Sequence, residues 1–121
     1  MRWIVLVLVA LAAAGCTGPA AGITVVGPAW RATVTTVPWP PRGITPHRLV
    51  VTFNGPQMQG PVRLRMRMPG MSHQETMTTL RAAGSGRYEG TVTFEMAGTW
   101  ELALLVGTPP RAAVATLAVQ P

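Results

Sequence analysis

The sequence of 121 residues has no lysine and no aspartate, and it contains only one cysteine and two histidines. A single cysteine, Cys16, cannot form an intramolecular disulfide and cannot supply a thiolate cluster for a metal. The acidic residues are all glutamates, and they are scattered over the predicted strands. Ser72 adjoins His73, but residues adjacent in sequence do not make a catalytic triad. We therefore expect no catalytic set, and we expect that the protein is not an enzyme.

The N-terminal stretch MRWIVLVLVALAAAGC has the layout of a secretory signal peptide, with Arg2 before an apolar run and small residues before Cys16. The apolar run is too short for a membrane span, which needs about 20 residues. LAAAGC resembles a bacterial lipobox, although Ala13 stands where leucine is usual. We predict a signal peptide over 1–15, acylation of Cys16 and export as a membrane-anchored lipoprotein facing the periplasm or the cell exterior. The alternative is a secreted protein with an unmodified thiol.

The basic residues are all arginines, and the formal net charge of the chain is +6. A basic surface suits anionic lipid or an acidic protein partner. Nucleic acid is a poor partner for a chain that is exported, and we expect none.

Residues 16–29 are rich in Gly, Ala and Pro, which indicates a tether that ends in an entering strand, ITVV. From residue 30 onward apolar and polar residues alternate with a period of two, and no segment has a helical period. Breakers rich in Gly and Pro divide residues 30–121, the predicted domain, into short strands: 30–37, 46–53, 62–68, 75–80, 87–95, 99–106 and 111–119. Seven to eight such strands predict an all-β fold, an immunoglobulin-like antiparallel β-sandwich. We also expect the protein to be a monomer.

The segment MRMPGMSH, residues 66–73, places methionines and a histidine around a Pro-Gly bend. Met66 and Met68 share one face of their strand, about 6.5–7 Å apart. Met71 and His73 follow the bend and are also two residues apart, so their side chains can turn back toward the strand end. A thioether is a soft, neutral ligand that favours Cu(I), and imidazole binds copper in either oxidation state. The cluster therefore predicts a copper site, with Cu(I) favoured.

Strand direction extends the predicted site. In an antiparallel sandwich successive strands alternate in direction, so the loops at 69–74 and 96–98 should open at the same end, together with the loop at 38–45. Met96 lies in the second of these loops. The predicted metal ligands are Met68, Met71, His73 and Met96, with Met66 and His47 in reserve. Met58 should lie at the far end and Met77 in mid-strand, so neither is expected to be a ligand.

Other interpretations of these residues are open. Methionine on the apolar face of a strand is commonly core packing, and this applies most to Met66. Arg63, Arg65 and Arg67 share the other face of the strand at 62–68. They form either a solvated face or a docking face for an acidic partner or lipid headgroups.

Two stretches, GPVRLRMRMPGMSH and GSGRYEGTVTFEMAGTWEL, resemble the YtkA-like/FixH-like family of small exported or membrane-anchored β domains. The resemblance covers roughly residues 30–119. Its specific parts are Met68-Pro69 with Met71 and His73, a Gly-x-Tyr step (Gly86, Tyr88), and M-x-G-x-W-x-L (Met96, Gly98, Trp100, Leu102). It implies an immunoglobulin-like sandwich and, for some members, copper handling linked to assembly of haem–copper oxidases. Residue by residue it points to Met68, Met71 and His73.

Together these observations predict an extracytoplasmic lipoprotein that acts as a copper chaperone or buffer. Its expected partners are the membrane, through Cys16, and an oxidase-assembly or copper-efflux protein. FixH-type members are held by a transmembrane helix, whereas this chain is predicted to be held by lipid. The alternative is a structural or interaction module without metal, in which the arginine face carries partner binding.

Overall fold

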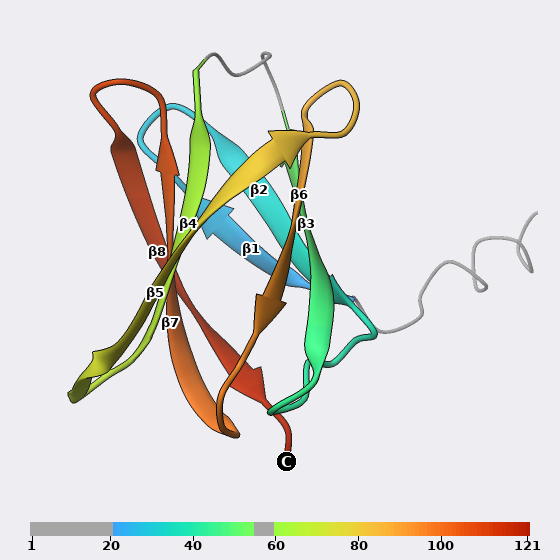
Figure 1. Cartoon of the computed structure of the whole chain (residues 1–121). Coiled ribbons are helices and arrows are strands. Elements are labelled where there is room, and N and C mark those ends of the chain that lie inside the picture. The colour runs from blue at the N-terminus through green and yellow to red at the C-terminus, as the bar shows by residue number, and fades with distance from the viewer. Residues whose placement is uncertain (1–20, 55–59) are drawn as a thin grey trace, which may run out of the picture.

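The structure, a computed structural model, describes residues 21–54 and 60–121, and these form eight β-strands (Figure 1). No helix long and apolar enough to cross a membrane occurs in these residues. The predicted signal peptide, Cys16 and Met58 lie outside the described residues. In chain order the strands are β1 (Ile23–Val26), β2 (Arg31–Val37), β3 (Pro46–Asn54), β4 (Val62–Met68), β5 (Met71–Ala82), β6 (Arg87–Thr93), β7 (Gly98–Val106) and β8 (Arg111–Val119).

The strands form two facing layers. Hydrogen-bonded neighbours follow the order β1-β2-β3-β6-β5-β4-β7-β8, and all pairs are antiparallel. β2, β3 and β6 lie in one layer and β4, β7 and β8 in the other, which matches the A-B-E and C-F-G strands of immunoglobulin-like sandwiches. The prediction of an all-β fold is therefore confirmed.

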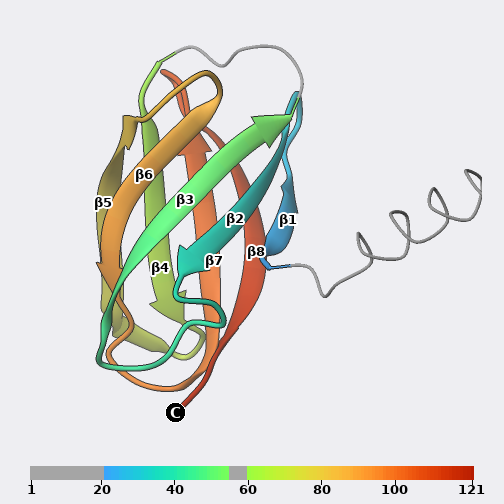
Figure 2. The same ribbon diagram turned by 90° about the vertical axis from the view of Figure 1, so that its right-hand side faces the viewer.

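β5 joins the two layers along one side. Most of its length pairs with β4, but Arg81 and Ala82 pair with Glu89 and Tyr88 of β6. On the opposite side β1 lies near β8, so the layers nearly close into a barrel (Figure 2). This closure leaves little exposed sheet edge for unwanted pairing.

The core lies between the layers and follows the alternation of the strands. In β4 the side chains of Val62, Leu64 and Met66 are buried and those of the intervening arginines face outward. Two rows of edge-to-face aromatic rings run through the core, Trp30–Phe53–Tyr88 toward one end and His47–Phe94–Trp100 toward the other. Every strand and core side chain described lies between residues 23 and 119, so this stretch has the elements needed to fold as a unit.

Among the strand boundaries that differ from the prediction, two affect the domain and the site. The sandwich begins before residue 30, because β1 pairs with β2 and buries Val25. β5 begins at Met71, so the predicted loop at 69–74 is only the two-residue turn Pro69–Gly70. Pro at the first and Gly at the second central position form a type II turn, and the φ of 82° at Gly70 is the value this turn requires. Such a short turn lets strand pairing resume at once.

Candidate metal site

Met68 and Met71 face each other across the Pro69–Gly70 turn. The ladder pairs them directly, and directly paired residues project their side chains to the same face, with Cα atoms about 4.5–5.5 Å apart. Both side chains are half-buried, and Met68 packs against the edge of the core. The hairpin therefore brings these two thioethers together.

The β4–β5 ladder changes register just before this turn. Met66 pairs with Thr76 and Met68 with Met71, so residues 72–75 of β5 lie opposite Arg67 alone. Bulges of this kind re-aim side chains and are common beside functional sites. His73 lies in this irregular stretch of backbone, and its side chain is outside what the structure describes.

Met96 reaches the same neighbourhood from the β6–β7 loop. The methyl carbon (Cε) of Met68 lies 2.6 Å from where a Cβ on Gly98 would stand, so Met68 packs directly on the glycine two residues after Met96. The buried Trp100 donates a hydrogen bond from Nε1 to the carbonyl oxygen of Met96, at 2.9 Å. Met96 itself is 41% exposed. A buried anchor thus fixes the loop while its thioether stays accessible.

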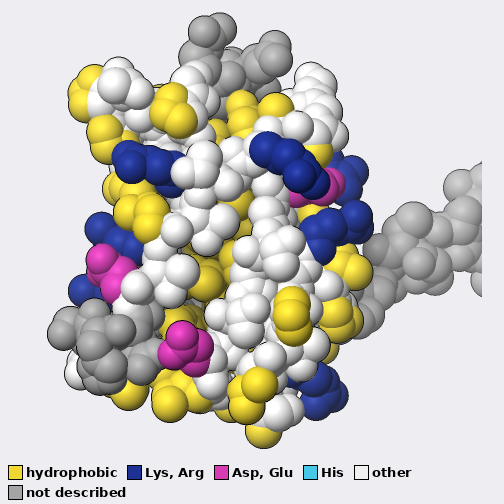
Figure 3. Space-filling model, in the orientation of Figure 1, with side chains coloured by type: hydrophobic (Ala, Val, Ile, Leu, Met, Phe, Trp, Pro, Cys, Tyr) yellow, Lys and Arg dark blue, Asp and Glu magenta, His cyan; other side chains and the backbone are white. Residues whose placement is uncertain are grey.

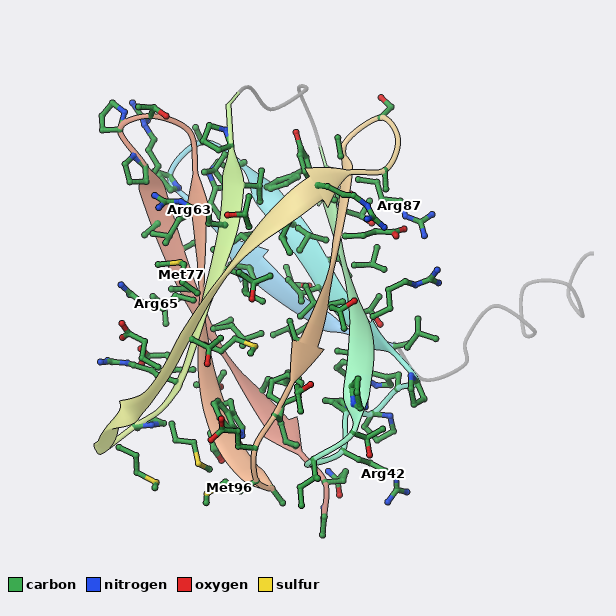
Figure 4. The ribbon with its side chains drawn as sticks, in the orientation of Figure 1. Arg42, Arg63, Arg65, Met77, Arg87 and Met96 are labelled. Atoms are coloured by element: carbon green, nitrogen blue, oxygen red, sulfur yellow. The ribbon has the colours of Figure 1, made fainter. Side chains whose placement is uncertain are left out.

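The predicted common end of these loops is confirmed. Besides the contact between Met68 and Gly98, the backbone of Gly43 packs on that of Met96 and Ala97, and the Ile44 N–H donates to the Phe94 carbonyl. Met77 is elsewhere: it lies in mid-strand on the outward face of β5, well away from Met96 (Figure 4).

The two reserve candidates, Met66 and His47, are buried, unlike Met68, Met71 and Met96. Met66 is 1% exposed and belongs to the core cluster, as the packing interpretation expects. His47 is also 1% exposed, and both ring nitrogens are engaged. Nε2 accepts the backbone N–H of Arg42 at 3.1 Å, which requires the Nδ1 proton to be donated to the Thr45 carbonyl, 2.6 Å away. Neither nitrogen has a free lone pair for a metal ion.

The donors at this end are soft. Within residues 21–54 and 60–121, no three described His, Cys, Asp or Glu side chains gather closely enough to hold a metal. Thioethers from Met68, Met71 and Met96 fit a soft ion such as Cu(I) and do not fit a hard cation. Their partial burial also suits a few-coordinate, exchangeable site.

The arginine face is altered by one ion pair. Nε of Arg67 lies 2.8 Å from Oε1 of Glu101 on β7. Arg63 and Arg65 form no ion pair with the described residues. The predicted stripe of like charges is therefore reduced to two arginines.

Sequence reasoning missed the role of Gly98. A Cβ here would stand 2.6 Å from the Met68 methyl group, so the flexible end of Met68 would have to move, and the φ of 136° also favours glycine. The M-x-G-x-W spacing could have indicated this role, since it places a glycine between Met96 and Trp100, whose indole binds the Met96 carbonyl.

Comparison with known proteins matches the part of the chain that carries this site. Residues 61–104 match a family model described as YtkA-like. The predicted YtkA-like resemblance is thereby confirmed, over a shorter range than expected. No curated protein matches the chain. No solved structure matches it either. The YtkA-like segment includes the β4–β5 hairpin and the β6–β7 loop, and hence Met68, Met71, His73 and Met96.

Proposed function

We propose that this protein binds copper, as Cu(I), through Met68, Met71 and Met96 with His73, and acts as an extracytoplasmic copper chaperone or buffer. The observation that carries the proposal is the direct pairing of Met68 with Met71, with Met68 resting on the Gly98 that follows Met96. Methionines scattered for packing alone have no reason to meet at one edge of the sandwich, half in solvent.

The chemistry of the donors supports Cu(I) over other ions. A neutral thioether does not need to lose a proton to bind, and it discriminates against hard cations. A site without cysteine also survives an oxidising compartment, where thiols are lost to disulfides. Acylation at Cys16 would hold the domain at the membrane, within reach of an oxidase-assembly or copper-efflux protein.

The proposed mechanism is ligand exchange, with the ion as cargo. Met96 is the most exposed of the described donors, so an incoming ligand from an acceptor displaces it first. The ion then stays briefly shared between the acceptor and the Met68–Met71 pair, and it leaves as these two are replaced in turn. No bond of the protein is made or broken, so the role is that of a carrier and not of an enzyme.

The test is a Cu(I) titration of residues 17–121 against a competing chromophoric chelator, repeated with Ag(I) as a redox-inert ion. We expect one ion per chain, with binding abolished by Met71→Ala combined with His73→Ala. Met77→Ala is the matched control, because Met77 is 48% exposed yet lies away from the site, and it should leave the affinity unchanged.

Two results would contradict the proposal. One is a wild-type protein that cannot compete with the chelator. The other is an equal loss of affinity in the Met77 control, which would mean that any exposed methionine suffices. If the double variant instead unfolds, then these residues serve packing, and the protein is better regarded as an interaction module without metal.

A further inference from the structure

The outward face of the β5-β4-β7-β8 layer carries a second feature that does not depend on copper. The ladder aligns Met77, Arg65, Ala103 and Val114 in one row across the four strands. The next row contains Thr79, Arg63, Leu105 and Ala112. Facing residues of neighbouring strands stand side by side on one surface, so these rows form a continuous patch, here named the Arg63/Arg65 face.

The floor of this face is apolar although it points outward. Ala103 is 1% exposed and Leu105 is 9% exposed, while Arg63 and Arg65 beside them are half-buried. The aliphatic stems of arginines can cover apolar neighbours while the charged heads stay in water. At the rims Met77 and Val114 are 48% and 55% exposed. The face therefore presents two cations between two apolar rims.

Neither cation forms an ion pair among the described residues. Glu101, in the next row, pairs with Arg67 at 2.8 Å, and Glu75, two residues before Met77 on β5, is exposed and pairs with neither arginine. The other ion pair described, Arg87 with Glu89, is on β6. Figure 4 shows Arg63, Arg65 and Met77 together on one side of the sandwich, and Figure 3 shows basic and hydrophobic side chains along that side, with an acidic side chain among them. Unpaired arginines beside exposed aliphatic groups are typical of protein interfaces.

The composition of the face favours a protein over a lipid surface, because arginine and methionine are enriched at protein interfaces. Charge complementarity then identifies the occupant as an acidic surface.

We propose that the Arg63/Arg65 face is a docking surface for a partner protein whose surface carries clustered carboxylates. The two guanidinium groups pair with carboxylates, and Met77 and Val114 bury their exposed area at the rims. Arg67 takes no part, because Glu101 already holds it.

The test uses residues 17–121, after confirming cooperative unfolding, with a poly-glutamate peptide as the probe in amide NMR titrations at low salt. We expect shifts concentrated along the row from Met77 to Val114, and affinity at least about tenfold lower in Arg63→Glu with Arg65→Glu. The matched control is Arg31→Glu with Arg48→Glu, an equal charge change on the exposed side of β2 and β3. Arg63→Gln with Arg65→Gln keeps much of the stems, and it replaces the charge reversal if that variant unfolds.

Three outcomes decide the proposal. Shifts on the face that disappear in the Arg63/Arg65 variants and persist in the control support it. Equal losses in both double variants would reduce the effect to net charge and overturn it. Vesicles of phosphatidylglycerol that bind through the same residues, with no response to the peptide, would overturn it in favour of a membrane.

Discussion

The two ends of the sandwich are built from similar aromatic rows but are held differently. Trp100 and Trp30 are both buried, and each packs edge-to-face on a phenylalanine. Trp100 donates its indole N–H to the Met96 carbonyl, whereas the Trp30 Nε1 atom is buried without a partner among the described residues. The indole of Trp100 is therefore held by a hydrogen bond and that of Trp30 by packing alone. The hydrogen-bonded indole is at the end where the thioethers meet, where the proposed ligand site needs fixed geometry.

The largest loss of stability should come from substitution of His47, which is buried at the end of the sandwich that carries Met68, Met71 and Met96. His47→Ala removes two hydrogen bonds and leaves a cavity, which should cost about 2–5 kcal/mol of unfolding free energy. Urea denaturation measures this cost. Amide exchange should rise first at Ile44, whose N–H bonds Phe94, while Phe53, bonded to Gly86 at the other end, stays protected. Uniform loss of protection would mean that the ends are not independent.

A smaller loss of stability is expected from substitution of Gly98, on which the Met68 side chain packs. Gly98→Ala meets both a positive φ and the Met68 methyl group, and it should cost about 1–3 kcal/mol and weaken Cu(I) binding. Gly70→Ala is the control, since its φ is 82° but nothing lies within 4 Å of the added Cβ. Both variants should lose stability, as measured by thermal unfolding, but only the first should lose affinity in the chelator competition. Equal Cu(I) affinities of the two variants would mean that Gly98 does not contribute to the site.

The smallest expected effect is the difference in stability between substitutions of Trp100 and Trp30. Trp100→Phe and Trp30→Phe remove the same volume, but only the first removes a hydrogen bond. Trp100→Phe should therefore be more destabilising by about 1 kcal/mol, the net value of one such bond. Parallel urea denaturation of the two variants measures this difference. If Trp30→Phe proved the costlier, the indole nitrogen of Trp30 would have a partner that the described residues do not include.

The fold could be predicted from the alternation of apolar and polar residues and from the Gly- and Pro-rich segments that separate the strands. Strand 62–68 and strand 111–119 were predicted with the bounds that β4 and β8 have, since buried and exposed residues alternate there. Strand direction also placed Met96 correctly beside the β4–β5 hairpin. The predicted loop at 69–74 is wrong at Met71, because a Pro-Gly turn needs only two residues and strand pairing resumes directly after it.

Side-chain contacts were harder to foresee. Nothing in the pattern around His47 indicates that Arg42 and Thr45 occupy both ring nitrogens, because these bonds depend on how the loop at 38–45 folds back. The ion pair between Arg67 and Glu101 depends on the β4–β7 register, which the alternation of apolar and polar residues does not specify. Such features arise from tertiary pairing between distant segments.

The Pro69–Gly70 turn has a consequence for how a bound ion couples to folding. Because Met68 and Met71 are separated by only two residues, closing the chain between them costs little entropy even in the unfolded protein. An ion held by this pair alone binds both states, and linkage then gives it little power to raise the melting temperature. Any rise in melting temperature caused by Cu(I) therefore measures the contribution of Met96 to binding, because only the folded chain brings this ligand near the pair.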